Sequence, residues 1–465
     1  MLWNGDSGTL SECIFINNSA NLGGAISWIG NDGSLMDSIF TNNTAKSSGG
    51  AVRWSGVNGI LIGSTFISNV VTDGNGGAVS WASASGNIDN SNFINNSAIQ
   101  GGAINWFGAN GTLSGSTFIN NIARTIGGGV FWYTANGKLS DVSFSGNSAV
   151  RGGGIYWSEV GPNGTLTNSN FASNNATYGG AIYLNATDCN LSHSNFTSNK
   201  AINNGGAIYW GGANGKLSNS NFINNNATYG GAVYWNGANG TLTDSNFAKN
   251  KAISNGGAVY WNGANGNLNY STFTNNIAAN NGAGIRWTGA NGKLISSTFT
   301  NNAANDNGGA ISWTGANGSL INSNLTGNIA TKGGGGGINW NGVNGTITGS
   351  IFSDNNANQG GAVYWYGANS TMSNCNFKNN YAAQGNNVYW QWTVNDFLNK
   401  YNQINDHDYV WIYNGVGTPN NTIVLTKKGI TISSEGNVTF DAKGRNVHFE
   451  VTGDNVLIEK ITFRN

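Results

Sequence analysis

Charged side chains, proline and cysteine are scarce in this 465-residue chain. Only 9% of its residues are charged and 2 are Pro, whereas a typical soluble protein has about 25% charged residues and about 5% Pro. Because 20 basic and 20 acidic side chains cancel, the chain lacks the basic field that attracts nucleic acid or an anionic membrane. No apolar run approaches the roughly 18 residues of a membrane-spanning helix, so we expect no direct membrane insertion.

The three cysteines indicate neither a disulfide framework nor a metal centre. Cys13 and Cys375 stand in the same column of the repeat described below, in its first and last copies. At the strand spacing of a β-structure they would lie roughly 70 Å apart, far beyond the reach of a disulfide. Cys189 stands alone in an irregular copy. We therefore expect no disulfide, no metal site and no cofactor.

Glycine, asparagine and aromatic residues dominate instead, and they recur with a fixed period. The chain has 72 Gly, 84 Asn, 17 Trp, 16 Tyr and 20 Phe. A Phe followed three residues later by Asn returns about every 26 residues from Phe15 to Phe377, and Leu325 replaces the Phe once. A second column is Trp at all but one position, where Leu184 replaces it. Self-similarity at such a period is typical of repeat architectures.

The repeat favours an all-β fold, a right-handed parallel β-helix of about fifteen coils of ~26 residues. Gly-Gly, Asn-Gly and β-branched or aromatic residues oppose helix and favour strands and tight turns. We expect two or three short strands per coil: Val233–Trp235 is one, and 242–247 is another that contains a bend or bulge. Asn-Gly pairs such as Asn214-Gly215 supply the positive backbone angles that turns demand.

Alternation along each strand predicts which columns point inward. The residue between Ile/Val and Trp varies from Arg53 to Ser80 and Tyr234, so we place it outside and place its neighbours inside. The Phe column is also inward, and the Asn that follows it sits at a corner, where its amide can stack coil on coil. Representative members of this structural ladder are Trp106, Trp132, Trp157, Trp210, Trp235, Trp261, Phe118, Phe222, Phe247, Asn121, Asn225 and Asn250.

The pattern divides the chain into a repeat domain at 1–390, a linker at 391–408 and the truncated first coils of a second β-helix at 409–465. In the linker, apolar residues at helical spacing follow Thr393, a plausible helix cap. This short helix could close the first solenoid or act as the lid of the second, and the sequence does not separate the two. Because Met1 falls on an interior position of the repeat, we expect a fragment of a longer protein whose signal and anchor lie outside it.

The paired motifs carry a resemblance. Gly23-Gly24-Ala25-Ile26 and its copies, together with Phe-x-x-Asn once per coil, resemble the repeats of the polymorphic outer membrane proteins, and they are similar to the adhesin-like surface proteins of methanogenic archaea. Residues 409–465 resemble the opening coils of pectate-lyase-like β-helices. The resemblance implies a secreted, extracellular rod on the cell surface, which attaches to a glycan or protein of a host or of a neighbouring microbe. Open coil ends also predict end-to-end self-association.

The carboxylates do not favour catalysis. Glycan lyases and hydrolases need several carboxylates in one cleft, but Asp37, Asp141 and Asp244 are about four coils apart, roughly 19 Å at the strand spacing. Asp406 and Asp408, beside His407, are expected in a surface loop. We predict a non-enzymatic adhesin-like protein with no catalytic residue. The alternative is a polysaccharide-acting β-helix whose active site lies outside this fragment.

An outward run of aromatic residues is the candidate binding face. Its members occupy successive coils and are Phe131, Tyr156, Tyr183, Tyr209, Tyr234 and Tyr260. Stacked at ~4.8 Å intervals, they would form a long, flat aromatic surface of the kind that sugars and partner side chains bind. The same run could equally serve only to stabilise the sheet through cross-coil pairs.

Overall fold

The computed structural model describes all residues except 414, 446, 448 and 465. It is an all-β parallel β-helix, so the predicted fold class is confirmed. The chain divides into two compact units, residues 1–253 with 258–264, and residues 254–257 with 265–465. Among the described residues, no helix is long and apolar enough to cross a membrane.

Each repeat coil contains four short strands rather than the two or three expected. In one coil these are β34 (Lys216–Ser218), β35 (Asn221–Ile223), β36 (Asn226–Tyr229) and β37 (Val233–Trp235). We call strands at these four positions B-, C-, D- and A-type, in that order. In this coil the central residues of the first two types, Leu217 and Phe222, are fully buried. The bend that the sequence indicated between Leu and Phe is therefore a corner between two separate strands.

A residue in the left-handed conformation turns each of the four corners. In the same coil Asn214 (φ 58°), Asn219 (φ 48°), Asn224 (φ 57°) and Gly230 (φ 61°) occupy these positions. Asn and Gly are the residues that tolerate this backbone region at least cost. The Asn of the predicted Asn-Gly turn therefore supplies the positive φ. The Gly has another role: a Cβ at Gly215 would clash with the indole ring of Trp210.

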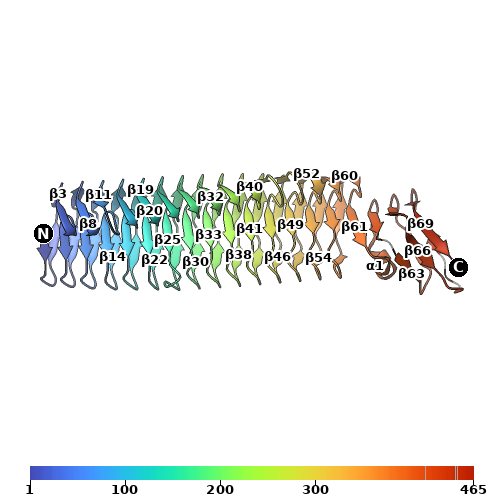
Figure 1. Cartoon of the computed structure of the whole chain (residues 1–465), viewed down its shortest axis with the longest axis horizontal. Coiled ribbons are helices and arrows are strands. Elements are labelled where there is room, and N and C mark those ends of the chain that lie inside the picture. Colours follow the sequence, from blue (N-terminus) through green and yellow to red (C-terminus); the bar gives the residue numbers. More distant parts are fainter. Residues whose placement is uncertain (414, 446, 448, 465) are drawn as a thin grey trace. The chain divides into compact units, whose positions relative to one another are not determined.

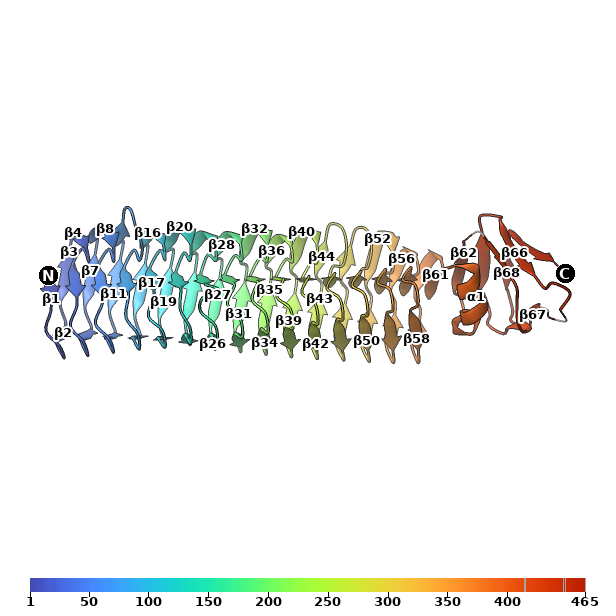
Figure 2. The same ribbon diagram turned by 60° about the horizontal axis from the view of Figure 1, so that its bottom comes forward.

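Consecutive coils pair in parallel and in register (Figures 1 and 2). In the first unit, A-type strands pair successively from β1 (Leu2–Trp3) to β41 (Val259–Trp261), which sets Trp opposite Trp except where Leu184 takes its place. The B- and C-type strands follow the same rule, Leu on Leu and Phe on Phe. Since equivalent residues meet across coils, each inward column becomes a continuous stack.

Stacked Trp and Phe rings form the core. Trp210 and Trp235 are fully buried, with ring centres 4.5 Å apart and planes within 4°. Phe222 and Phe247 stack at 4.7 Å. Leu184 interrupts the Trp stack, and it too is fully buried. Because one large aromatic side chain contributes roughly 1.5–3 kcal/mol on burial, these two stacks account for much of the cohesion between coils.

A buried amide ladder stands at the corner between C- and D-type strands. The side-chain Nδ2 of Asn225 donates to Oδ1 of Asn250 at 3.0 Å and to the carbonyl of Phe196 at 2.9 Å. Its Oδ1 accepts from the backbone N–H of Asn199 at 2.9 Å. Asn121 makes the equivalent bonds. From Asn43 to Asn355 the Asn column is fully buried, so its polar groups are satisfied within the core as buried amides require.

The end of the second unit departs from the repeat. Its elements are β61 (Val388–Trp392), α1 (Val394–Lys400), η1 (Tyr401–Gln403), β62 (Tyr409–Ile412), β63 (Gly415–Gly417), β64 (Ile423–Leu425), β65 (Thr431–Ser434), β66 (Val438–Asp441), β67 (Phe449–Val451), β68 (Leu457–Ile458) and β69 (Ile461–Arg464). β61, β62, β65 and β68 pair in parallel, so the A-type sheet continues past the boundary predicted at residue 390. This continuation brings the solenoid to about 18 turns, slightly more than the fifteen expected.

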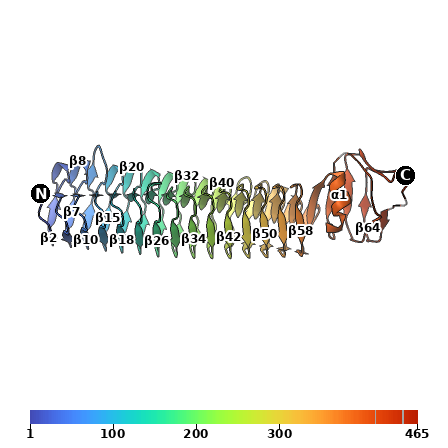
Figure 3. The same cartoon turned by 90° about the horizontal axis from the view of Figure 1, so that it is seen from below.

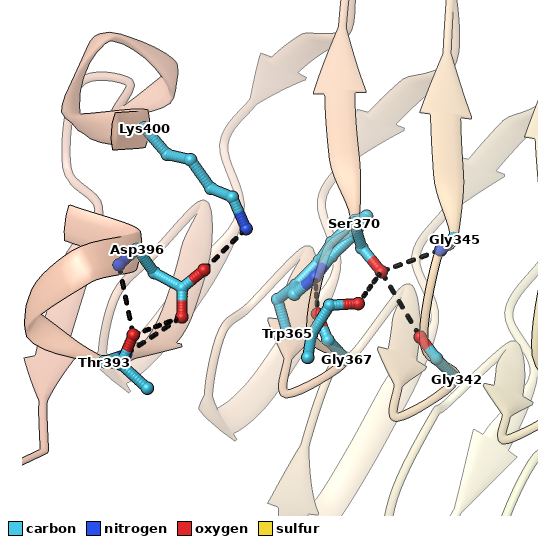
Figure 4. A network of polar contacts seen from close by, with 9 residues as sticks. Gly342, Gly345, Trp365, Gly367, Ser370, Thr393, Asp396 and Lys400 are labelled. Atoms are coloured by element: carbon cyan, nitrogen blue, oxygen red, sulfur yellow. Dashed lines mark hydrogen bonds and ion pairs between the residues drawn. The ribbon is translucent and has the colours of Figure 1, made fainter. Parts of the chain in front are cut away.

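Helix α1 begins at the predicted cap. Thr393 accepts from the N–H of Asp396, while the Asp396 carboxylate accepts from Thr393 and pairs with Lys400 at 2.8 Å (Figure 4). The buried face of the helix includes Phe397, whose ring lies 5.4 Å from that of Phe440. The helix therefore packs on the strands that follow it, as Figure 3 also shows. Figure 4 includes the indole of Trp365 donating to the carbonyl of Gly367 at 3.1 Å.

Candidate functional site

Five of the six candidate aromatic residues form one continuous row in the first unit. Tyr156, Tyr183, Tyr209, Tyr234 and Tyr260, which we call the tyrosine ladder, are the central residues of five A-type strands. These strands are β25 (Ile155–Trp157), β29 (Ile182–Leu184), β33 (Ile208–Trp210), β37 and β41. Each ladder tyrosine is half-buried, while its two strand neighbours are fully or almost fully buried. The alternation therefore places the phenols on the outer side of the sheet, as expected.

The rings stack face to face along the solenoid. Their centres are 5.2 Å apart from Tyr156 to Tyr183, 4.5 Å to Tyr209, 5.4 Å to Tyr234 and 5.1 Å to Tyr260. The planes of each pair lie within 19° of parallel. Each inner ring consequently has both faces covered by its neighbours and presents its edge and hydroxyl to solvent. The predicted stacking of the rings at the coil spacing is confirmed, and the surface that it presents consists of ring edges and hydroxyls rather than a flat aromatic plane.

Phe131 does not belong to the exposed row. Its side chain is only 5% exposed. Phe107, Tyr133 and Tyr156 surround its ring, with ring centres 6.1, 5.9 and 5.5 Å away. These three rings cover the apolar ring of Phe131. Phe131 therefore closes one end of the ladder and is unavailable to a ligand.

Residues from neighbouring strands flank the ladder. Tyr178, the last residue of β28 (Asn175–Tyr178), meets Tyr209 edge-on at 6.5 Å. Tyr229 meets Tyr260 in the same way at 5.9 Å. The guanidinium of Arg151 lies 5.7 Å from the centre of the Tyr183 ring. Sequence reasoning missed these flanking residues, although each stands just before a Gly-Gly turn that leads into the ladder strand.

Burial changes the acidity of the phenols. Desolvation raises the pKa of Tyr183 to about 12 and that of Tyr234 to about 12, and adjacent tyrosines add to both shifts. Desolvation also raises the pKa of Tyr156, which Arg151 partly offsets. Tyr156, Tyr183 and Tyr234 are thus neutral hydroxyls at physiological pH, able to donate and accept hydrogen bonds.

A second, shorter stack lies in the second unit. Tyr364, Tyr389 and Tyr409 stack with ring centres 5.2 and 5.0 Å apart. Gln391 donates from Nε2 to the Tyr364 hydroxyl at 2.8 Å and accepts from the Tyr413 hydroxyl at 2.9 Å. The sequence showed Tyr364 and Tyr389 in the same column but not the continuation to Tyr409, because the period breaks between β61 and β62.

Asp406 and Asp408, beside His407, were expected in a surface loop, but Asp408 is buried. Asp408 is 1% exposed, and its carboxylate accepts from the backbone N–H of Val388 at 3.1 Å and from Asn405 at 2.8 Å. Burial raises the pKa of Asp408 to about 7 against the lowering effect of these donors. Among the described residues, no three His, Cys, Asp or Glu side chains gather as metal ligands would.

Four segments match the model of the Chlamydia polymorphic membrane protein repeat, residues 37–53, 141–156, 193–209 and 296–312. The predicted resemblance to this repeat is confirmed: the chain carries polymorphic membrane protein repeats. Each matched segment runs from the corner before a C-type strand into an A-type strand, and two of them end on Tyr156 and Tyr209. No curated protein sequence matches the chain closely enough to count as a relative.

Solved β-helix structures show distant likeness. PfbA, a surface adhesin of Streptococcus pneumoniae, is 12% identical, with 77% of this chain and 84% of that chain covered and a TM-score of 0.30. A PL6 alginate lyase in complex with a trisaccharide is 10% identical, with 80% and 79% covered and a TM-score of 0.29. The tailspike of E. coli bacteriophage HK620 with a pentasaccharide is 11% identical, with 93% and 69% covered and a TM-score of 0.30. At these scores the likenesses carry no information on function.

Proposed function

We propose that this chain is a non-enzymatic, surface-displayed attachment protein whose tyrosine ladder contacts the partner. The observation that carries the proposal is the unbroken row of five half-buried phenols, 4.5 to 5.4 Å apart on one sheet of the first unit. If the row served only to hold the coils together, it would duplicate the cohesion that the buried Trp and Phe stacks already provide. The outer row adds aligned hydroxyls at the surface.

The chemistry of the row fits a polar, extended partner, a surface glycan or protein of another cell. Ring edges and hydroxyls bind through hydrogen bonds, and the rings themselves are held rigid by stacking. Tyrosine contacts lose little side-chain entropy on binding, and stacking between coils lowers that loss further. Asn236 and Asn262 follow the ends of two ladder strands. Their side-chain amides, joined by a hydrogen bond of 2.8 Å, add further polar groups beside the row.

The repeats support a location on the outer membrane or cell surface, since the matched model describes a membrane protein repeat. A sparsely charged solenoid would hold the tyrosine ladder away from that surface.

The test replaces only the hydroxyls. The variant Tyr183→Phe/Tyr209→Phe/Tyr234→Phe keeps the stacked rings, and therefore the fold, while it removes three hydrogen-bonding groups. The matched control is Asn170→Ser/Asn195→Ser/Asn221→Ser, which alters an exposed ladder on the C-type strands of the same coils. Both variants and the parent chain are applied to a glycan array and to immobilised animal and microbial cells.

We expect binding by the parent chain and the control, and at least a tenfold loss for the phenylalanine variant, which corresponds to about 1.4 kcal/mol. Equal binding by the two variants would remove the ladder from the contact surface. A folded parent chain that binds no glycan and no cell would contradict the attachment function. Release of reducing ends from any polysaccharide on the array would contradict the non-enzymatic part.

A further inference from the structure

We infer that a pocket at the end of the D-type sheet binds a single neutral sugar ring, such as the terminal residue of a glycan. The last D-type strand is β60 (Tyr381–Gln384), and no further strand of this type follows it among the described residues. In its place lies a solvent-open pocket of about 400 Å³, within the range of ligand sites. Its walls include Gln384, Gly385, Asn386, Tyr409, Thr431 and Glu459.

Unpaired backbone donors point to an oxygen-rich ligand. In the preceding coil, the N–H groups of Gly360 and Gly361 donate to the carbonyls of Gln384 and Gly385 at 2.9 and 3.0 Å. The equivalent groups one coil later are the N–H of Gly385 and Asn386. Within the described part of the chain they have no acceptor, because no further repeat turn follows. Both residues line the pocket, and the regular direction of the coil aims their N–H groups into it.

Side chains on the walls supply complementary groups. Glu459 accepts from Ser433 Oγ at 2.8 Å through Oε1, and among the described residues its Oε2 has no partner. The Oε1 atom of Gln384 accepts from Gln359 at 2.7 Å, which leaves its Nε2 as a donor. A sugar hydroxyl both donates and accepts, so it can bond to the carboxylate and to the backbone N–H groups together.

The tyrosine stack ends at this pocket. Tyr389 covers one face of the Tyr409 ring at 5.0 Å. The next residue in register after Tyr409 is Thr431, and the Tyr409 side chain is only 9% exposed. The stack therefore contributes a largely buried aromatic wall to the pocket, beside the hydrogen-bonding groups described above, and such a mixed lining suits a sugar.

The charged side chains in the lining of the pocket favour a neutral ligand over an acidic one. Glu459 supplies the carboxylate of the pocket wall, because the enclosed carboxylate of Asp408 is 1% exposed, and His407 is the only basic side chain in the lining. An acidic sugar would bring a second carboxylate next to Glu459 in a half-enclosed site, which is unfavourable. The tyrosine ladder and this pocket belong to different units of the chain. Sugar binding by the pocket therefore does not require the ladder, and only its role in attachment rests on the proposed function.

The experiment uses the full chain and simple sugars as probes. Methyl glycosides of glucose, galactose and mannose, with N-acetylglucosamine and glucuronic acid, are titrated separately by saturation-transfer difference NMR. The test variants are Glu459→Ala and Gln384→Ala. The matched control is Lys460→Ala, which is next to Glu459 and exposed but lies outside the pocket lining. Melting curves confirm that each variant folds.

We expect saturable binding of at least one neutral sugar, with a Kd of order 1 mM as befits a small ligand. Binding should weaken at least tenfold in Glu459→Ala and Gln384→Ala, and stay unchanged in Lys460→Ala and in the triple phenylalanine variant of the tyrosine ladder. No saturation by any neutral sugar up to about 50 mM, tighter binding of glucuronic acid, or equal binding in Glu459→Ala and Lys460→Ala would each overturn the inference. Since these readouts use free sugars, they are independent of the cell-attachment assay.

Discussion

The indole N–H of Trp390 donates to Oδ2 of Asp408 at 2.9 Å, in the coil where the Trp column ends. The N–H of Val388 donates to the other carboxylate oxygen at 3.1 Å. In the preceding coil the equivalent N–H, that of Val363, donates to the carbonyl of Asn387 at 2.9 Å. Asp408 therefore takes the place of a backbone acceptor where the repeat stops, and its carboxylate is fully enclosed.

This enclosure predicts a pH-dependent stability. Burial raises the pKa of Asp408 from 3.8 to about 7, so between these values the folded chain holds a proton that the unfolded chain releases. The free energy of unfolding of this segment should fall as pH rises through that window, with a limiting slope of about 1.4 kcal/mol per pH unit. Asp408→Asn cannot ionise and should lose this slope.

The measurement is pulse proteolysis in urea at about pH 5 and about pH 8, which reports the stability of the segment containing residues 388–412. Asp454→Asn, at an exposed position, controls for the loss of one negative charge. The prediction is wrong if the parent chain and Asp408→Asn show the same change between the two pH values.

Leu184 and Cys189 together replace the Trp and Gly that stand five residues apart in neighbouring coils, as in Trp210 and Gly215. Both replacements are buried. A Trp at position 184 would meet the side chain of Cys189, because a Cβ at the equivalent Gly clashes with the indole. We expect Leu184→Trp to destabilise the chain by about 1–3 kcal/mol through overpacking.

Adding Cys189→Gly should recover most of that loss by restoring the Trp–Gly pair. A double-mutant cycle in urea therefore should show a coupling of at least about 1 kcal/mol between the two positions. Simple additivity of the two substitutions would show that the two side chains do not compete for the same space.

The buried and exposed amide ladders should differ sharply in energy. Asn225→Ala removes the side-chain partner of the Phe196 carbonyl and of the Asn199 N–H in the core, whereas Oδ1 of Asn250 keeps its bond from the backbone N–H of residue 225. Each buried group left unpaired costs about 1–3 kcal/mol, so we expect a loss of at least about 2 kcal/mol. Asn221→Ala removes only an exposed bond of 2.9 Å to Asn195 and should change stability by less than about 0.5 kcal/mol. Urea denaturation of the two variants checks the difference, and similar losses would contradict it.

Ionisation of Tyr183 and Tyr234 should require alkaline pH and should destabilise the fold. The pKa values of Tyr183 and Tyr234 are raised from 10.0 to about 12 by burial. For an acid with a raised folded-state pKa, the stabilising contribution is complete below the unfolded value and is lost as pH rises through the folded value. Stability should therefore fall between about pH 10 and about pH 12.

Tyrosinate absorbance during an alkaline titration follows the ionisation, and circular dichroism follows the fold. The triple phenylalanine variant removes the ionisations of Tyr183 and Tyr234 and should keep its structure to higher pH than the parent chain. Loss of structure at the same pH in both proteins would show that other groups control alkaline unfolding.

The sequence by itself determined the repeat, the β-helix and the inward columns, and even the cap at Thr393, because these follow from local patterns. A period of about 26 residues aligns equivalent residues, so Trp210 must face Trp235 once coils pair in parallel. Alternation along a three-residue strand then fixes which side chains are inside.

Only the tertiary structure decided what those columns present to a partner. The distance between coils equals the stacking distance of rings, so the ladder tyrosines expose their edges and not their faces. Three neighbouring rings bury Phe131. Asp408 is polar and lies in an irregular segment, so its sequence context suggests exposure. It is buried because the end of the Trp column needs an acceptor there. These outcomes depend on contacts between coils that single-coil patterns do not contain.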